Sequence, residues 1–125
     1  MTKLLGVIGD PIAHSMSPLI HNGWLRDLRI DATYEAMHVP EGAFPDAIET
    51  LSKRDTLGVN VTLPHKSSAL AAAATSSPAA KAIGAANTLT FDGDSWHADN
   101  TDAPGFLEAL GSLDPYSDKV VLLGS

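Results

Sequence analysis

Residues 58–66 read GVNVTLPHK, and this stretch predicts a buried strand that breaks directly into a helix. Val59 and Val61 are β-branched residues of the kind that favours strands. Pro64 lacks a backbone N–H and has a preset φ, so it suits the first position of a helix. The alanine-rich segment behind it favours a helix over 64–75.

This geometry places three polar side chains at the carboxyl end of a strand, where open α/β sheets bind their ligands. They are Asn60, Thr62 and Lys66. An alternative is that Asn60 and Thr62 are turn residues and that Lys66 is a solvated charge. A lysine in the first turn of a helix opposes the helix dipole, however, so Lys66 needs another reason to be there.

The rest of the chain alternates strands and helices, which predicts a three-layer α/β/α domain with a mostly parallel sheet. One antiparallel hairpin is expected around Asp92-Gly93-Asp94. Ser17 is a natural N-cap for a helix with one apolar stripe, and Gly84 is a natural left-handed C-cap. Strands are expected over 4–8, 33–39, 58–63 and 95–98, and residues 85–91 are expected to start as a turn and become a strand. Helices are expected over 18–28, from 40 to about 52, and over 64–75, 78–83 and 103–110.

Turn-forming residues at 111–118 suggest a linker, which divides the chain into a domain over 1–112 and a second segment over 113–125. In that segment, residues 119–125 read as a buried parallel strand that runs into Gly124. A dinucleotide-binding βαβ unit begins in this way, so we expect the first strand of an incomplete Rossmann domain and place a cofactor contact at Gly124.

Composition narrows the class of partner. The chain of 125 residues has 15 acidic and 8 basic residues and a net charge of −7, which argues against nucleic acid as a partner. It has no cysteine, which favours a cytoplasmic protein without disulfides or thiolate metal sites. The apolar run near Met1 is too short for a signal peptide or a membrane span, so no membrane association is expected.

Four polar clusters are expected at strand ends or helix starts. Together they offer hydroxyls, amides, one ammonium and one carboxylate, which suits a polyhydroxylated anion. Two serines beside a helix N-terminus suit a carboxylate in particular, because the local N–H groups favour negative charge. The clusters are Ser15/Ser17, Asn60/Thr62/Lys66, Asn87/Thr88 and Asn100/Thr101/Asp102.

Lys66 and Asp102 are the cation and the anion among these clusters. A partly desolvated lysine can lose its proton near neutrality, and a neighbouring carboxylate can orient it, so the pair suits proton transfer at an alcohol whose carbon gives up hydride. The hydride acceptor must be a cofactor. Alternatively, Ser17 is only a cap, Asn87 and Asn100 satisfy backbone groups in turns, and Asp102 is an acid at a helix N-terminus. The five histidines show no metal-binding spacing, so no metal is assigned; His14 and His65 adjoin the expected site.

Four ordered motifs resemble those of the shikimate dehydrogenase family. The resemblance covers nearly the whole chain, and four motifs in order are far more specific than any one. The motifs are residues 8–18 (IGDPIAHSMSP) with His21 and Asn22, residues 58–66 (GVNVTLPHK), residues 83–88 (IGAANT), and residues 100–102 (NTD) with Gly105.

The resemblance implies a substrate-binding domain for the NADP-dependent interconversion of 3-dehydroshikimate and shikimate, a step of aromatic amino acid biosynthesis. It implies that Lys66 is the acid/base group, paired with Asp102, and that Ser15 and Ser17 bind the substrate carboxylate. The substrate hydroxyls would be contacted by Asn60, Thr62, Asn87 and Asp102.

The chain also departs from the family pattern. Ala86 stands where valine is common, and the nucleotide domain and a C-terminal helix with a substrate-binding glutamine are missing. We therefore expect the chain alone to bind substrate weakly and to lack turnover. Three alternatives remain: a quinate/shikimate dehydrogenase, a non-catalytic binding module for a hydroxylated carboxylate, and an α/β domain whose polar clusters are only caps and turns.

Overall fold

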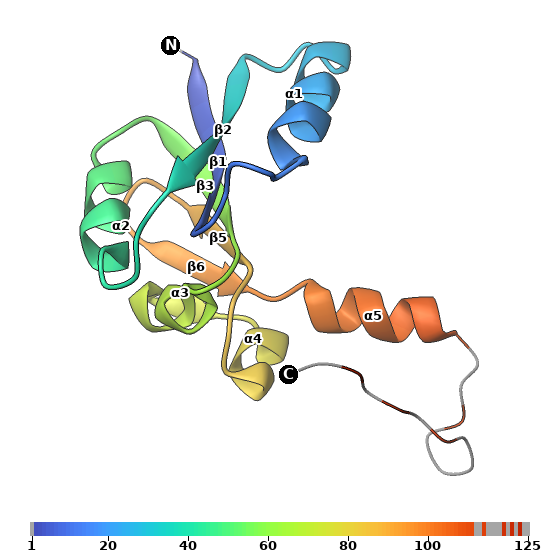
Figure 1. Ribbon diagram of the computed structural model, residues 1–125. Coiled ribbons are helices and arrows are strands. Elements are labelled where there is room, and N and C mark those ends of the chain that lie inside the picture. Colours follow the sequence, from blue (N-terminus) through green and yellow to red (C-terminus); the bar gives the residue numbers. More distant parts are fainter. Residues whose placement is uncertain (1, 112–113, 115–118, 120, 122, 124–125) are drawn as a thin grey trace.

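The computed structural model describes residues 2–111, 114, 119, 121 and 123, and it contains one six-stranded sheet flanked by helices (Figure 1). The strands are β1 (Lys3–Gly9), β2 (Ala32–His38), β3 (Thr56–Val61), β4 (Thr75–Ser76), β5 (Thr88–Phe91) and β6 (Trp96–Asp99). The helices are α1 (Ser17–Asp27), α2 (Phe44–Ser52), α3 (Lys66–Ala72), α4 (Pro78–Ile83) and α5 (Asp102–Leu110).

The strand order is β2-β1-β3-β5-β6-β4. The β1 strand is parallel to β2 and to β3, β5 is antiparallel to both β3 and β6, and β4 is parallel to β6. All the described strands except β5 therefore run in one direction. The amino end of β5 consequently lies at the same edge of the sheet as the carboxyl ends of its neighbours.

Helices cover both faces of the sheet, because consecutive side chains of a strand point to opposite faces. Ile8 packs in the larger core cluster with Phe44 of α2 and Ala69 of α3. Its neighbour Val7 packs in a second cluster, against which Leu25 of α1 lies. The sequence-based prediction of a three-layer α/β/α domain with a mostly parallel sheet is thus confirmed.

Two local predictions are confirmed at their turns. The α4 helix spans the predicted residues and ends at Gly84, whose φ of 78° is the left-handed conformation that glycine adopts without steric cost. The hairpin pairs Thr88 with Asp99 and turns through Gly93, whose φ is 99°. Both glycines lie at positive φ, so local backbone chemistry fixes these boundaries.

The prediction that Pro64 opens a helix over 64–75 was wrong. The Thr62 carbonyl accepts a hydrogen bond from the His65 N–H at 3.1 Å, and Pro64 lies inside this turn after a cis peptide bond. This hydrogen-bonded turn over residues 62–65 precedes the helix, so α3 begins only at Lys66. The helix also ends early, at Ala72, because residues 75–76 form β4 beside β6.

Two other helix starts differ from the prediction. The α2 helix begins at Phe44 because Gly42 has a φ of 86° and cannot belong to a right-handed helix. The expected Ser17 N-cap was also wrong. Met16 occupies the N-cap position, while Ser17 is the first helical residue and donates its N–H to the Ser15 hydroxyl at 3.2 Å.

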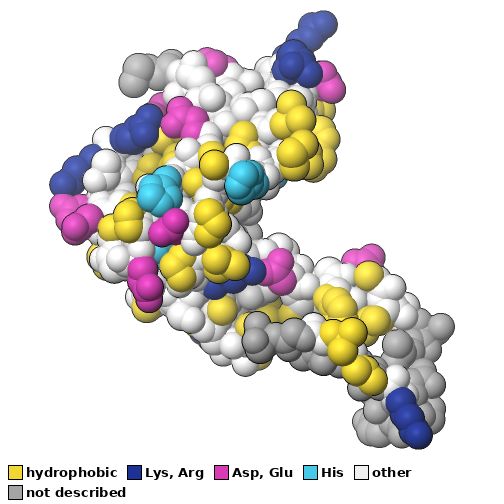
Figure 2. Space-filling model, in the orientation of Figure 1, with side chains coloured by type: hydrophobic (Ala, Val, Ile, Leu, Met, Phe, Trp, Pro, Cys, Tyr) yellow, Lys and Arg dark blue, Asp and Glu magenta, His cyan; other side chains and the backbone are white. Residues whose placement is uncertain are grey.

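The apolar stripe of α1 faces outward over much of its length. No residue of α1 is buried, and Leu19, Trp24 and Leu28 are 69%, 56% and 69% exposed. Figure 2 shows hydrophobic side chains gathered over this part of the molecule and again over α5, where Phe106 and Leu107 are exposed. These helices therefore contribute little to the core of the described chain.

The expected linker and strand at 113–125, including Gly124, lie mostly outside the described residues. Within the described part of the chain, no helix is long and apolar enough to cross a membrane.

Candidate functional site

The four polar clusters meet at one edge of the sheet. The loop after β1 carries Ser15, and α1 begins at Ser17. The end of β3 carries Asn60, and the residues after β6 lead into α5. Asn87 directly precedes β5, and it reaches the same edge because β5 runs against its neighbours. Figure 2 shows that the surface is hollowed between the part that carries α1 and the part that carries α5.

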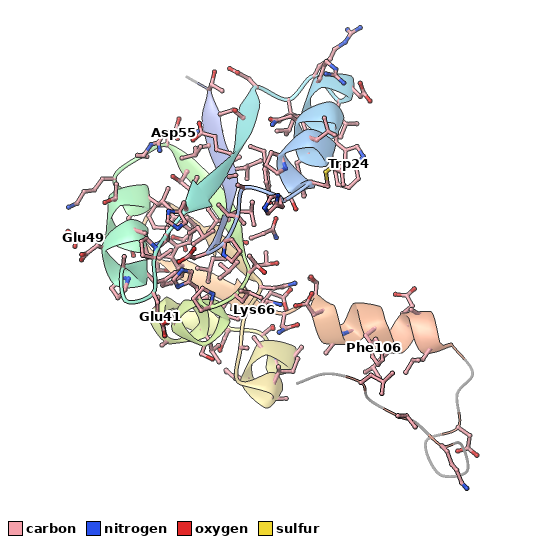
Figure 3. The ribbon with its side chains drawn as sticks, viewed as in Figure 1. Trp24, Glu41, Glu49, Asp55, Lys66 and Phe106 are labelled. Atoms are coloured by element: carbon pink, nitrogen blue, oxygen red, sulfur yellow. The ribbon has the colours of Figure 1, made fainter. Side chains whose placement is uncertain are left out.

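Lys66 and Asp102 form an ion pair in this region. Lys66 Nζ lies 2.6 Å from Asp102 Oδ2, although the residues are 36 positions apart. Each is the first residue of its helix, and Figure 3 shows Lys66 where α5 leaves the body of the molecule. The side chains are 37% and 56% exposed, so the pair contributes little to stability, as is usual for surface salt bridges.

Asn100 fixes the position of Asp102. Its side chain is buried, with 3% exposure, and its Oδ1 accepts the Asp102 N–H at 3.0 Å. Its Nδ2 donates to the Ala85 carbonyl at 3.0 Å, which ties the start of α5 to the segment before β5. The alternative role considered for Asn100, satisfying backbone groups in a turn, is therefore the one that the structure shows.

A chain of side-chain hydrogen bonds joins the clusters on β3, β5 and β6. Asn60 Nδ2 donates to Thr88 Oγ1 at 3.3 Å, and Thr88 Oγ1 donates to Asn87 Oδ1 at 3.0 Å. Asn87 Nδ2 then donates to Thr101 Oγ1 at 2.8 Å. These bonds fix the orientation of the Asn60 and Asn87 side-chain amides. An amide in a fixed orientation presents either its N–H or its oxygen to a ligand, and can therefore select a ligand acceptor or a ligand donor.

The serines line a separate part of the same edge. Ser15, Ser17 and Thr62 surround a cavity of about 320 Å³ together with His14, Val7, Pro11 and Ile12. Ser17 lies in the first turn of the 11-residue α1 helix, where N–H groups and the helix dipole favour an anion. This cavity therefore offers hydroxyl donors to a small negatively charged group.

The two histidines expected beside the site have different roles. His14 lines the serine cavity. His65 is 2% exposed, lies 2.5 Å from the Val39 carbonyl through Nε2 and packs against the ring of Phe44. His65 is therefore a core residue that secures the loop after β2. Among the described residues, no group of three or more His, Cys, Asp or Glu could hold a metal ion.

Sequence reasoning missed Tyr34 as part of this region. Tyr34 lies on β2 with 4% exposure, and its hydroxyl donates to Asn60 Oδ1 at 2.7 Å. Burial raises the pKa of Tyr34 from 10.0 to about 12, and a side-chain hydrogen bond with Ser17 lowers it in part. The available signal was a tyrosine within a predicted strand, because a tyrosine hydroxyl usually finds a hydrogen-bond partner when it is buried.

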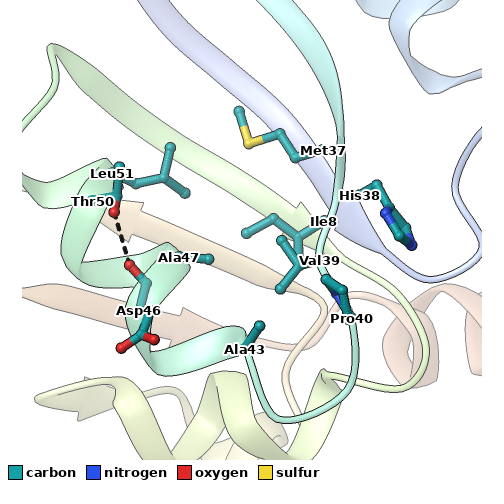
Figure 4. A pocket seen from close by; sticks show the side chains of 10 residues that line it. All are labelled: Ile8, Met37, His38, Val39, Pro40, Ala43, Asp46, Ala47, Thr50 and Leu51. Carbon is teal, nitrogen blue, oxygen red and sulfur yellow. Dashed lines mark hydrogen bonds between the residues drawn. The ribbon is translucent and has the colours of Figure 1, made fainter.

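A second, apolar pocket lies between β2 and α2 (Figure 4). It has a volume of about 350 Å³ and is lined mainly by apolar side chains, among them Ile8, Met37, Val39 and Leu51. His38, Asp46 and Thr50 also line it, and Thr50 Oγ1 donates to the Asp46 carbonyl at 2.9 Å. None of the residues predicted for the site lines it.

The fold and the polar edge define a class of protein: an α/β domain whose lysine–carboxylate pair lies among hydroxyls and amides, a set of groups that suits a small hydroxylated anion. Residues 7–89 match the family model of the shikimate dehydrogenase substrate binding domain. The chain therefore belongs to the shikimate dehydrogenase substrate-binding domain family.

Individual proteins agree with this assignment. The chain is 49% identical to shikimate dehydrogenase (NADP(+)) from Hyphomonas neptunium over 100% of its own length and 47% of that protein. It superimposes on the crystal structure of shikimate 5-dehydrogenase from Thermus thermophilus, in complex with NADP(H) and shikimate, with a TM-score of 0.80 and 43% identity. That match covers 88% of this chain and 41% of the Thermus chain.

The same architecture occurs in a solved structure with a different name. The ligand-free 5-ketofructose reductase of Gluconobacter matches with a TM-score of 0.83 at 25% identity, over 91% of this chain and 41% of that one. The present chain spans about half the length of the curated relatives that it matches.

Proposed function

We propose that the chain is the substrate-binding half of an NADP-dependent shikimate dehydrogenase, which interconverts 3-dehydroshikimate and shikimate in the cytoplasm. The observation that carries this proposal is the contact of 2.6 Å between Lys66 Nζ and Asp102 Oδ2 at the polar edge of the sheet. The family membership and the 49% identity to a shikimate dehydrogenase support it.

The roles of the polar residues follow from their chemistry. Ser15 and Ser17 bind the substrate carboxylate, because their hydroxyls line a cavity at a helix N-terminus. The hydroxyls of the substrate are bound by the amides and the carboxylate of the connected clusters, and by the Thr62 hydroxyl beside the serines. These residues are Asn60, Thr62, Asn87 and Asp102.

Lys66 moves the proton in the reaction. When 3-dehydroshikimate is reduced, the ketone carbon receives a hydride, and the carbonyl oxygen takes a proton from Lys66 Nζ. In the reverse direction Lys66 accepts that proton from the alcohol. Asp102 holds the ammonium in place through its contact of 2.6 Å. NADPH, when bound, would supply the hydride for reduction, and NADP+ would accept it in the reverse direction, because side chains do not provide hydride.

We further propose that residues 1–112 form the substrate domain and that residues 113–125 lead into the dinucleotide-binding domain, with Gly124 in its glycine-rich turn. The fraction of the relatives that the chain covers, 47% for the Hyphomonas protein, supports this division. NADP would then be held mostly by parts of the protein beyond this chain, and the chain alone would lack turnover.

A matched pair of lysine variants tests the role of Lys66 in the full-length protein. Lys66→Ala should lower kcat for shikimate oxidation with NADP+ by about 10²–10⁴-fold, the usual size of a general acid–base contribution. Lys53→Ala is the control, because Lys53 forms a comparable but remote ion pair with Glu49 at 2.7 Å. Equal activity in both variants would contradict the proposal.

The same assay separates an enzyme from a binding module. A full-length protein that binds shikimate tightly but reduces no NADP+ would be a non-catalytic binding module. Asp102→Asn keeps the shape of the side chain and removes its charge, so it should lower kcat while the protein stays folded. Unchanged kcat in Asp102→Asn would contradict the role given to the ion pair.

A further inference from the structure

The hydrogen-bond chain across the sheet has a fixed direction. The Thr101 N–H donates to Asn87 Oδ1 at 3.0 Å, and a backbone N–H cannot accept, so this bond fixes which atom of the Asn87 amide is oxygen. Thr88 Oγ1 lies 3.0 Å from the same oxygen and must therefore donate to it. The single hydrogen of Thr88 is thereby committed, and its oxygen is left to accept.

The direction then passes to Asn60 and Tyr34. Because Thr88 Oγ1 accepts, the Asn60 atom 3.3 Å away from it is the nitrogen. The other atom of the amide is Oδ1, which accepts the hydrogen of the Tyr34 hydroxyl at 2.7 Å. The Thr101 backbone N–H thus determines the direction of every hydrogen bond in this chain. Tyr34 is the residue that donates to the oxygen of Asn60.

Tyr34 is itself held firmly by α1. Asn22 brackets the backbone of Tyr34: its Nδ2 donates to the Tyr34 carbonyl at 2.8 Å, and its Oδ1 accepts the Tyr34 N–H at 2.9 Å. The ring of His21 stacks on the ring of Tyr34 with centroids 4.2 Å apart and an interplanar angle of 5°. The hydroxyl of Tyr34 is therefore aimed at Asn60 by two adjacent residues of one helix.

We propose that Tyr34 is a positioning residue that makes Asn60 present an N–H donor to an oxygen of the substrate. Asn60 Nδ2 carries two hydrogens, of which Thr88 receives one, and among the described residues no hydrogen bond uses the other. Without the Tyr34 hydroxyl, the longer contact of 3.3 Å with Thr88 is the one side-chain hydrogen bond that still holds the amide among the described residues, so the amide loses its fixed position. The inference rests on the proposed function, in which Asn60 contacts a substrate hydroxyl.

Tyr34→Phe in the full-length protein tests this role, because phenylalanine keeps the ring that stacks on His21 and removes only the hydroxyl. We expect KM for shikimate to rise about tenfold with little change in kcat, since the proposed Asn60 contact is to a substrate oxygen other than the one that exchanges a proton with Lys66. KM for NADP+ should stay unchanged. Thr75→Val is the control, because it removes a hydroxyl from a remote pair with His97 and should leave both KM values as they are.

A double-mutant cycle with Asn60→Ala shows whether Tyr34 acts through Asn60. In the Asn60→Ala background, Tyr34→Phe should change KM for shikimate by less than about twofold. An equally large effect of Tyr34→Phe in both backgrounds, or no effect of it on KM in the wild-type background, overturns the proposal. A parallel loss in kcat and in both KM values also overturns it, because that pattern indicates a merely structural role.

A spectroscopic measurement keeps this test separate from the proposed function. The side-chain amide of Asn60, assigned by its loss in Asn60→Ala, should shift in the ¹⁵N NMR spectrum of Tyr34→Phe without any substrate. If the wild-type protein does not oxidise shikimate but this shift occurs, the proposed function fails while the positioning of Asn60 stands. An unshifted amide overturns the positioning itself.

Discussion

Tyr34 illustrates how its surroundings set the chemistry of a single side chain. Its ring is buried between α1 and the sheet, and burial raises the pKa of its hydroxyl to about 12. The hydroxyl therefore stays protonated, and able to donate to Asn60, at any pH at which the protein would work. A tyrosine on the surface would have neither the raised pKa nor the hydrogen bond to Asn60.

The raised pKa predicts a specific loss of stability at alkaline pH. The folded state binds the Tyr34 proton more tightly than the unfolded state, whose pKa is near 10, so the contribution is complete below pH 10 and lost as the pH rises to 12. A shift of this size corresponds to about 2–3 kcal/mol. Thermal midpoints measured from pH 8 to 12 should fall more steeply for the wild type than for Tyr34→Phe, and parallel curves would refute the assignment.

At the scale of elements, the site depends on the direction of β5 and on the close approach of the β3 and β5 backbones. The β5 strand runs against its neighbours, which brings Asn87 to the edge that carries Lys66 and Asp102. The contact between β3 and β5 is tight at Gly58, where an added Cβ would lie 2.6 Å from the Leu89 carbonyl oxygen. A side chain at this position would push the two strands apart.

Gly58→Ala should therefore destabilise the protein, by about 1–3 kcal/mol, the range for overpacked buried sites. Gly105→Ala is the matched control, because it lies in α5 and an added Cβ there meets no atom within 4 Å. It should be neutral or stabilising by about 0.5–1 kcal/mol. Thermal midpoints of the two variants compared with the wild type measure the difference, and similar midpoints for both would count against the close contact.

On the scale of the whole molecule, the described chain leaves two helices incompletely covered. The α5 helix projects from the body in Figure 1, and Phe106 on it is 58% exposed. The curated relatives are about twice as long as this chain, which covers 47% of the Hyphomonas protein. The side chains proposed to bind substrate lie within the described residues, whereas Gly124, the proposed cofactor contact, lies outside them.

The chain alone should therefore show no saturable binding of NADPH. Two tryptophans provide the measurement, since Trp24 is exposed on α1 and Trp96 is buried in the core. Their fluorescence should not change in a saturable way as NADPH is added, whereas the full-length protein should give a saturable change. A saturable change in the chain alone would show that it already contains a cofactor site.

The sequence by itself determined the order of most elements and some of their boundaries. Local chemistry was sufficient for this: the alternation of strands and helices, the left-handed glycine at 84 and the hairpin turn at 92–94 each depend on neighbouring residues only. The family motifs also marked Lys66 and Asp102 before their contact was known. These features need no knowledge of strand order.

Only the tertiary structure decided which side chains meet. The turn that holds Pro64 displaced the start of α3, and the link from Tyr34 to Asn60 joins residues 26 positions apart. The exposure of the apolar face of α1 was likewise decided by tertiary structure. The sequence of a helix shows which side is apolar, but not which element packs against that side. Contacts between distant residues follow from strand order and direction, which are set by burial across the whole sheet.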